Sequence, residues 1–175
     1  MILNNYWKWL NICQTTNAYN TDYNAPVYNI GIIDTTGDEK PISPNDSSGG
    51  WGEANHWCRN FASGSILFGS GNDDISATDY SMSNDCTSSI GNVNYNVTSS
   101  ANDDGFSRTI TVTGYNNSGS ELTITEVGYA KSLFWHDRDL GNQYYSALFC
   151  KTKLNEPLTL PVGGNFLINL AWNEA

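Results

Sequence analysis

Hydrophobic and polar residues alternate in short runs along much of the chain, and turn-forming residues separate the runs. The clearest runs are Thr109–Thr113 and Leu122–Val127, and the second one places Glu126 on the face of its leucine and isoleucine. A period of two residues is typical of a strand with one buried face. Between these runs, Asn116–Gly119 favours a chain reversal because Asn and Gly tolerate positive φ. We therefore predict that Phe106–Trp172 is an antiparallel meander of strands.

Three earlier runs also predict strands. They are Val27–Asp34, Ser65–Gly69 and Val93–Val97, each bounded by Gly, Pro, Asn, Asp or Ser. Thr35–Gly50 contains two prolines among Asp, Ser and Gly residues, which predicts a long exposed loop. The many short strands and the spacing of the turns favour an all-β fold, an antiparallel β-sandwich of jelly-roll or immunoglobulin-like type.

Met1–Gln14 is the segment with helical periodicity. Its apolar stripe consists of Leu3, Tyr6, Trp7, Leu10 and Cys13. Trp9 and Ile12 fall outside this stripe, so the helix is either buried in its own domain or offers a second face to another chain. A strand is the competing interpretation. We expect residues 1–60 to form an extension with assembly contacts and residues 61–175 to form the β-sandwich domain.

The chain is rich in uncharged polar residues and has few charged ones. Only 15% of the residues are charged, against about 25% in typical globular proteins. The formal net charge of −10 repels phosphate backbones and anionic lipid, so we expect no nucleic-acid or membrane partner. The scarcity of His, Lys and Arg argues against an enzyme. Nucleotide, dinucleotide and zinc-protease fingerprints are missing, and we expect no cofactor.

The four cysteines are widely spaced, at positions Cys13, Cys58, Cys86 and Cys150. They show no C-x-x-C spacing, which argues against zinc. An even number permits two disulfides in a secreted protein, whereas isolated buried thiols are expected in a reducing compartment. Met1–Cys13 lacks the apolar run of a signal peptide. We therefore expect reduced thiols and a protein made in a cytoplasm.

Two histidines are the main candidates for catalysis. Glu53 and His56 would lie one turn apart on a helix, as an acid–base pair requires. The second histidine, His136, begins the alternating-charge segment His136–Asp139. No nucleophile or substrate-binding pattern accompanies either one, so packed or exposed histidines are the expected interpretation.

Clustered aspartates are the candidates for metal binding. Calcium requires six to eight oxygen ligands on a flexible loop. Aspartates occur close together in two loops, as Asp73, Asp74 and Asp79 and as Asp103 with Asp104. Neither loop has the spacing of an EF-hand, and hydrogen bonds to nearby backbone N–H groups explain aspartates in turns. We expect no metal site.

The 6 tryptophans and 10 tyrosines are the remaining functional signal. Such residues fill cores, anchor protein contacts or stack on sugars in carbohydrate-binding sandwiches. Trp7, Trp9 and Trp172 lie near the two ends of the chain, which favours protein contacts. The charged segment after Trp135 is either a hairpin loop or a docking contact made by Arg138.

Four short sequence segments carry a family resemblance. Ile66–Gly71 with Thr78–Met82 follows the pattern I-x-x-G-x-G … T-D-x-x-M, where the last position of the related pattern is usually Leu. Glu121–Tyr129 and Glu156–Phe166 read E-L-T-I-T-E-V-G-Y and E-P-L-T-L-P-V-G-G-N-F. Together the segments resemble structural proteins of small tailed bacteriophages, the last two being similar to their closing β-sandwich.

The resemblance implies a non-enzymatic virion component of the head-decoration, tail or fibre-attachment kind, with no catalytic residues to transfer. Its partners would be other virion proteins, in a homo-oligomer or a larger symmetric assembly. A carbohydrate-binding, receptor-recognition module is the alternative. We expect that deleting Met1–Gln14 leaves a folded sandwich that no longer joins its particle. The predicted assembly contacts are Tyr6, Trp7, Trp9, Leu10, Trp135, Arg138 and Trp172.

Overall fold

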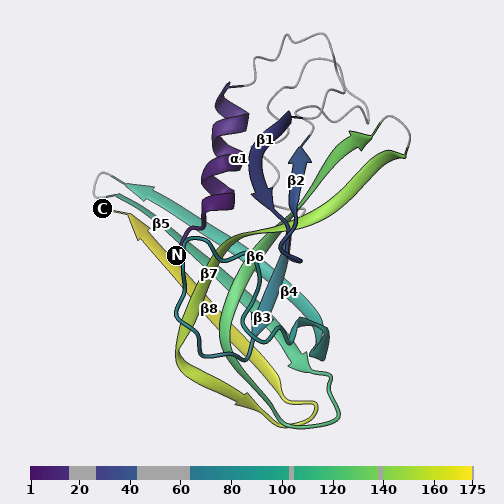
Figure 1. Ribbon diagram of the computed structural model, residues 1–175. Coiled ribbons are helices and arrows are strands. Elements are labelled where there is room, and N and C mark those ends of the chain that lie inside the picture. The colour runs from purple at the N-terminus through teal and green to yellow at the C-terminus, as the bar shows by residue number, and fades with distance from the viewer. Residues whose placement is uncertain (16–26, 43–63, 103–104, 138–139, 175) are drawn as a thin grey trace.

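Antiparallel strands make up most of the chain, and one short helix lies near its N-terminus (Figure 1). The computed structural model describes residues 1–15, 27–42, 64–102, 105–137 and 140–174. In chain order, the elements are α1 (Asn4–Thr15), β1 (Val27–Ile33), β2 (Glu39–Ile42), β3 (Gly64–Gly69), the 3-10 turn η2 (Thr87–Ser89), β4 (Ile90–Asn102), β5 (Gly105–Asn116), β6 (Leu122–Asp137), β7 (Gly141–Leu160) and β8 (Asn165–Glu174). The predicted antiparallel, mostly β chain with an N-terminal helix is confirmed.

The strands form three sheets. β1 pairs with β2, and the other strands form two three-stranded sheets in the orders β3-β6-β7 and β4-β5-β8. Figure 1 shows α1, β1 and β2 on the same side of these sheets as the free end of the β6–β7 hairpin. The predicted meander is wrong, because the consecutive strands β5 and β6 lie in different sheets, as do β7 and β8. Both connections cross from one sheet to the other.

The two three-stranded sheets contribute side chains to one hydrophobic core. Phe68 of β3 is fully buried, and its ring centroid lies 5.6 Å from that of Phe166 on β8, edge to face. Trp9 and Ile32 belong to the same core. Described residues of the first 60 positions therefore pack into the core of the β domain. The other buried members are Ile66, Cys86, Ile90, Val112, Ile124, Val127, Tyr129, Leu133, Tyr145, Ala147, Phe149, Leu160 and Ile168.

Asn116 holds the two crossing connections together. Its side-chain Nδ2 donates to the carbonyl oxygens of Ser120 at 2.8 Å, Leu160 at 3.0 Å and Pro161 at 3.2 Å. Its Oδ1 accepts from the backbone N–H of Ser118 at 2.9 Å. The Asn116 side chain therefore donates hydrogen bonds to carbonyl groups in or next to both crossing connections. These bonds explain why the Asn116–Gly119 turn leads into the opposite sheet rather than into a hairpin.

We expect Asn116→Ala to lower the free energy of unfolding by about 2–3 kcal/mol, because the Leu160 and Pro161 carbonyl groups lose the side-chain donor that Asn116 supplies. Urea unfolding followed by tryptophan fluorescence measures the change. Asn117→Ala is the matched control, since the Asn117 side chain is exposed, and it should leave the midpoint nearly unchanged. Equal midpoints for the two variants would contradict the role of Asn116.

A bulge in the β6–β7 pairing, with its extra residues on β7, changes the face on which Glu126 lies. The pairing of β6 with β7 shifts register between Ile124 and Glu126. Ile124 and Val127 both belong to the core between the sheets, so the strict alternation is broken between them. The predicted placement of Glu126 beside Ile124 is therefore wrong. The bulge keeps the carboxylate out of the hydrophobic core and places it on the opposite face of the sheet.

The buried face of α1 differs from the predicted stripe. Trp9 is 3% exposed and Trp7 is 54% exposed, the reverse of the stripe. Asn5 determines this orientation: its Nδ2 donates to the carbonyls of Ile33 at 2.7 Å and Leu148 at 3.2 Å, and its Oδ1 accepts from Ile33 N–H at 3.0 Å. The residues four apart, Asn5 and Trp9, therefore face β1 and β7.

The predicted Thr35–Gly50 loop is partly a strand. β2 lies inside it and pairs with β1 across a short turn, while residues 43–50 lie outside the described part. A proline is tolerated in β2 because this sheet has only two strands, each with a free edge. The hairpin was not predicted from the sequence, because its turn combines the Asp34 side chain with a single glycine, Gly37, at a φ of +94°.

Asp34 forms that turn. Its Oδ1 accepts from Thr36 N–H at 2.9 Å, Thr36 Oγ1 at 2.6 Å and Asp38 N–H at 3.0 Å. Burial by itself raises the pKa of Asp34, but these hydrogen bonds and the Lys40 ammonium outweigh it, so the pKa lies below its ordinary value. The carboxylate stays ionised and keeps accepting all three bonds at neutral pH.

Candidate functional site

The segment from residue 70 to 86 covers the outer face of β6 and β7; we call it the covering loop. Its Met82 packs with Ala130 and Leu148 in a second small hydrophobic cluster. Backbone bonds from Gly71 N–H to the Ser83 carbonyl, 2.9 Å, and from Cys86 N–H to the Phe68 carbonyl, 3.0 Å, close the loop on itself and on β3. Part of the outer face of this sheet, around Ala130 and Leu148, is therefore buried as well.

Three charged side chains meet where the covering loop contacts the sheet, and we call them the charge cluster: Asp79 of the loop, Glu126 of β6 and Lys151 of β7. Lys151 Nζ lies 3.2 Å from Asp79 Oδ2 and 3.2 Å from Glu126 Oε1. Glu126 is fully buried and Lys151 is 3% exposed. Glu126 Oε1 also accepts from the backbone N–H of Ser83 at 2.5 Å. The cluster thus ties the covering loop to both β6 and β7.

Glycines allow this close packing. A Cβ at Gly69 would lie 2.4 Å from Glu126 Oε1, and one at Gly128 would lie 2.7 Å from Met82 Sδ. Thr125, at the bulge, donates from Oγ1 to the Gly69 carbonyl at 3.1 Å. The segments Ile66–Gly71, Thr78–Met82 and Glu121–Tyr129, read separately in the sequence, are therefore neighbours in space.

The charge cluster is suited to holding structure rather than to meeting a substrate. Lys151 is neutralised by two carboxylates, and the covering loop separates Glu126 from solvent. Glu126 Oε2 is buried with no hydrogen-bond partner in the described part of the chain. A general acid or base must reach the proton it transfers, and burial denies Glu126 that access. The sequence alternation gave no sign of this cluster, because the bulge creates it.

The aspartates considered for calcium have separate partners. Asp79 contacts Lys151, Asp74 Oδ1 lies 3.3 Å from Lys153 Nζ, and Asp73 Oδ2 accepts from Ser83 Oγ at 2.5 Å. Among the residues that the structure describes, no group of three or more metal-binding side chains converges. Asp103 and Asp104 lie outside the described residues, as do Glu53, His56 and the side chain of His136.

Two cysteines are described, and both are free thiols. Burial, together with the nearby Asp85 carboxylate, raises the pKa of the Cys86 thiol to about 11. Burial also raises the pKa of Cys150. Both thiols are protonated at neutral pH, and a protonated thiol is a poor nucleophile. The side chains of Cys13 and Cys58 lie outside the described part.

The predicted assembly contacts that the structure describes differ in their exposure to solvent. Trp7 is exposed, whereas Tyr6 is half-buried and packs against the core. Trp9 is buried beside Phe149, with ring centroids 5.4 Å apart, so its ring is not available to a neighbouring subunit in this conformation. The remaining predicted contacts lie outside the described side chains: Leu10, Trp135, Arg138 and Trp172.

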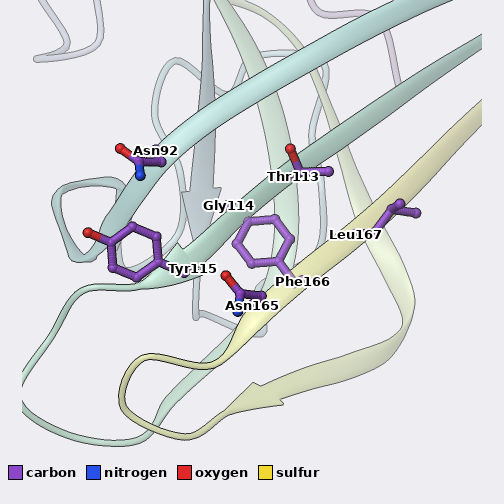
Figure 2. Close-up of a pocket in the computed structure, with 7 residues that line it drawn as sticks. All are labelled: Asn92, Thr113, Gly114, Tyr115, Asn165, Phe166 and Leu167. Carbon is purple, nitrogen blue, oxygen red and sulfur yellow. The ribbon is translucent and has the colours of Figure 1, made fainter.

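Two hollows are described, and Lys151 of the charge cluster is among the lining residues of the first. One, of about 350 Å³, is mostly apolar and opens between the sheets beside Tyr129, Cys150 and Leu170. The other is a groove of about 550 Å³ on the sheet formed by β4, β5 and β8, with Tyr115 and Asn165 among its lining residues (Figure 2). The threonine alternation in the sequence predicts an exposed face here, but not a groove.

Comparisons of the chain with protein-family profiles, with characterised proteins and with solved structures find no match. Within the described residues, no helix has the length and apolar character needed to cross a bilayer.

Proposed function

We propose that this protein is a non-enzymatic structural subunit of a bacteriophage particle, where it binds neighbouring virion proteins as a head-decoration, tail or fibre-attachment component. The single observation that carries the proposal is spatial. The segments whose sequences resemble phage structural proteins pack on one another through the bulge in the β6–β7 pairing, the motif glycines and the charge cluster. If the sequence matches were chance similarities between unrelated turns, there would be no reason for the matching segments to contact one another in the fold.

The fold supports the same proposal. Side chains from the two three-stranded sheets share one core, as in a β-sandwich, and we propose this architecture, of the jelly-roll or immunoglobulin-like type expected from the sequence. A rigid core with a neutral polar surface suits a protein whose work is to pack against neighbours. In this proposal the chain acts in the virion after synthesis in the host cytoplasm.

Trp7 is the contact that the geometry favours. Its ring is 54% exposed on a helix fixed by Asn5, so it needs no rearrangement to reach a partner. Leu140 and Tyr144, near the free end of the β6–β7 hairpin, are also exposed large side chains. Exposed aromatic residues on rigid elements are enriched at protein interfaces.

Deleting Met1–Gln14, the test suggested by the sequence, cannot distinguish a loss of assembly contacts from a loss of folding. Removing Met1–Gln14 would also remove Leu3, which is fully buried, and Trp9. It would further remove the backbone bond from Leu3 N–H to the Phe149 carbonyl, 2.9 Å. We now expect this deletion to unfold the protein, so a point substitution is required.

We expect Trp7→Ser to keep the wild-type melting temperature and to lower incorporation into particles, because it removes an exposed contact but no core contact. Incorporation is measured by mixing tagged variant and wild-type protein during particle assembly and quantifying both in purified particles. Val162→Ser is the control, since Val162 is 60% exposed in the β7–β8 connection. Equal incorporation of Trp7→Ser and the control would contradict the proposed contact.

A further inference from the structure

The outer face of the β4-β5-β8 sheet is uncharged over its described side chains, although the whole chain has a net charge of −10. The alternation along each strand and the pairing of β5 with both neighbours place one set of residues on this face. They are almost all amides and hydroxyls. The set is Asn94, Asn96, Thr98, Thr109, Thr111, Thr113, Tyr115, Asn165, Leu167, Asn169 and Ala171.

A β-bulge hollows this face near one end of the sheet. β4 shifts register against β5 between Gly91 and Asn94, and Asn92 has a φ of +48°. A positive φ is tolerated by Asn more readily than by most residues. The extra residue places Asn92 at the edge of the groove, and Figure 2 shows it beside the Tyr115 ring, with Asn165 beyond that ring on β8. Bulges often re-aim side chains at sites of this kind.

The Tyr115 ring is held in place at the groove. A Cβ at Gly91 would lie 2.5 Å from Tyr115 Cζ, so the ring occupies the space that the glycine leaves. Its hydroxyl lies 3.4 Å from Asn117 Oδ1. The ring is half-buried and lines the groove together with Leu167, which is 61% exposed. A ligand would therefore meet a fixed aromatic surface.

The polar groups of the groove are available to a ligand. The side chains of Asn92, Thr113 and Asn165 form no hydrogen bond within the described part of the chain. This differs from the adjacent Thr111, whose Oγ1 donates to Asn169 Oδ1 at 2.9 Å. The two amides and the hydroxyl supply both donors and acceptors, and no internal bond has to break for them to bind.

We propose that this groove binds a neutral saccharide. Sugar hydroxyls both donate and accept, which matches amides and hydroxyls, while the C–H groups of a pyranose ring carry partial positive charge and pack on the negative face of an aromatic ring. The groove volume, about 550 Å³, lies in the range of small-ligand sites. Among the described residues no charged side chain lines it, and the acidic chain repels phosphorylated, sulfated and sialylated ligands.

This proposal is independent of the proposed structural role, because glycan binding and incorporation into particles are measured separately. The probes are neutral oligosaccharides of glucose, galactose, mannose, rhamnose and N-acetylglucosamine, titrated into the full-length protein. The readout is the NMR signals of the side-chain amides of Asn92 and Asn165. We expect at least one probe to shift both signals and to bind with a low-millimolar or tighter Kd.

Substitutions locate the binding. We expect Tyr115→Ala to weaken binding by about tenfold or more, because the stacking surface is lost, and Asn165→Ala to weaken it as well. Tyr80→Ala is the control, since Tyr80 is an exposed tyrosine on the covering loop. The Tyr80→Ala variant should bind the saccharide with the affinity of the wild type. Matching melting temperatures establish that each variant is folded.

Three outcomes would overturn the proposal. The first is a failure of every neutral probe to shift the Asn92 and Asn165 signals at millimolar concentration. The second is wild-type affinity in the Tyr115→Ala variant. The third is a groove that responds to a heparin hexasaccharide or to an extended peptide but to no neutral sugar.

Discussion

Lys151→Met should destabilise the protein by about 3–5 kcal/mol, because it leaves the buried Glu126 carboxylate without its counter-charge. Glu126 is fully buried, and the lysine is the cation paired with it among the described residues. A methionine keeps the volume of the side chain but carries no charge. For a chain of this size the corresponding fall in melting temperature is roughly 10 °C or more. Differential scanning calorimetry measures it directly.

The control is a second lysine of the same strand. Lys153 forms an ion pair with Asp74 at the surface, where such pairs contribute little, and Lys153→Met should barely change the melting temperature. The double variant Glu126→Leu/Lys151→Met removes both buried charges and should regain most of the lost stability. If Lys151→Met and Lys153→Met had equal effects, the charge cluster would not be shielded from solvent as described.

Phe68→Ala should lower the free energy of unfolding by about 3–5 kcal/mol, because the ring is fully buried and its removal leaves a cavity. Phe166→Ala should have a similar effect. The rings lie edge to face, 5.6 Å apart, on strands of different sheets. A double-mutant cycle should therefore show a coupling of about 0.5–1.5 kcal/mol. Chemical denaturation of the four proteins gives this coupling.

A pair from separate clusters provides the comparison. Leu3 lies in the small cluster under the covering loop, away from Phe166, so Leu3→Ala and Phe166→Ala should be additive within about 0.5 kcal/mol. Where an alanine variant fails to fold, the leucine variants of Phe68 and Phe166 supply the cycle. Additivity between Phe68 and Phe166 would mean that the two sheets do not share a packed core.

The hydrophobic pattern was sufficient to locate several strands, although β2 was missed. Val27–Asp34 corresponds to β1, Ser65–Gly69 to β3, and the run at Val93–Val97 lies inside β4. The aliphatic positions of β5 also face the core as expected, since Val112 is buried while Thr111 and Thr113 are on the other face. A two-residue period depends only on which face of a strand is buried, so it can be read from neighbouring residues.

The pairing of the strands required information from distant residues. Asn116 favours a turn in any context, but its bonds to the Leu160 and Pro161 carbonyls make that turn a crossing between sheets. In the same way, Asn5 selects the buried face of α1 through bonds to Ile33 and Leu148. Both side chains bond to residues far away in sequence. The periodicity of hydrophobic residues contains no information about such contacts.

The two candidate sites depend on bulges. One bulge turns Glu126 out of the core and creates the charge cluster, and the other brings Asn92 beside Tyr115. The β4 bulge adds a single residue, the bulge beside Glu126 places extra residues of β7 opposite Thr125, and neither leaves a composition signal of its own. The sequence thus provided the polar residues of the uncharged face, while the backbone irregularities that assemble them became visible only in the structure.

The most direct test of the central proposal is the protein content of purified phage particles. Quantitative peptide mass spectrometry should be applied to density-gradient-purified particles of the phage that, under this proposal, encodes the chain. The account predicts peptides of this protein in multiple copies per particle, enriched together with the other structural proteins. Peptides present in the infected-cell lysate but absent from the purified particles would contradict it.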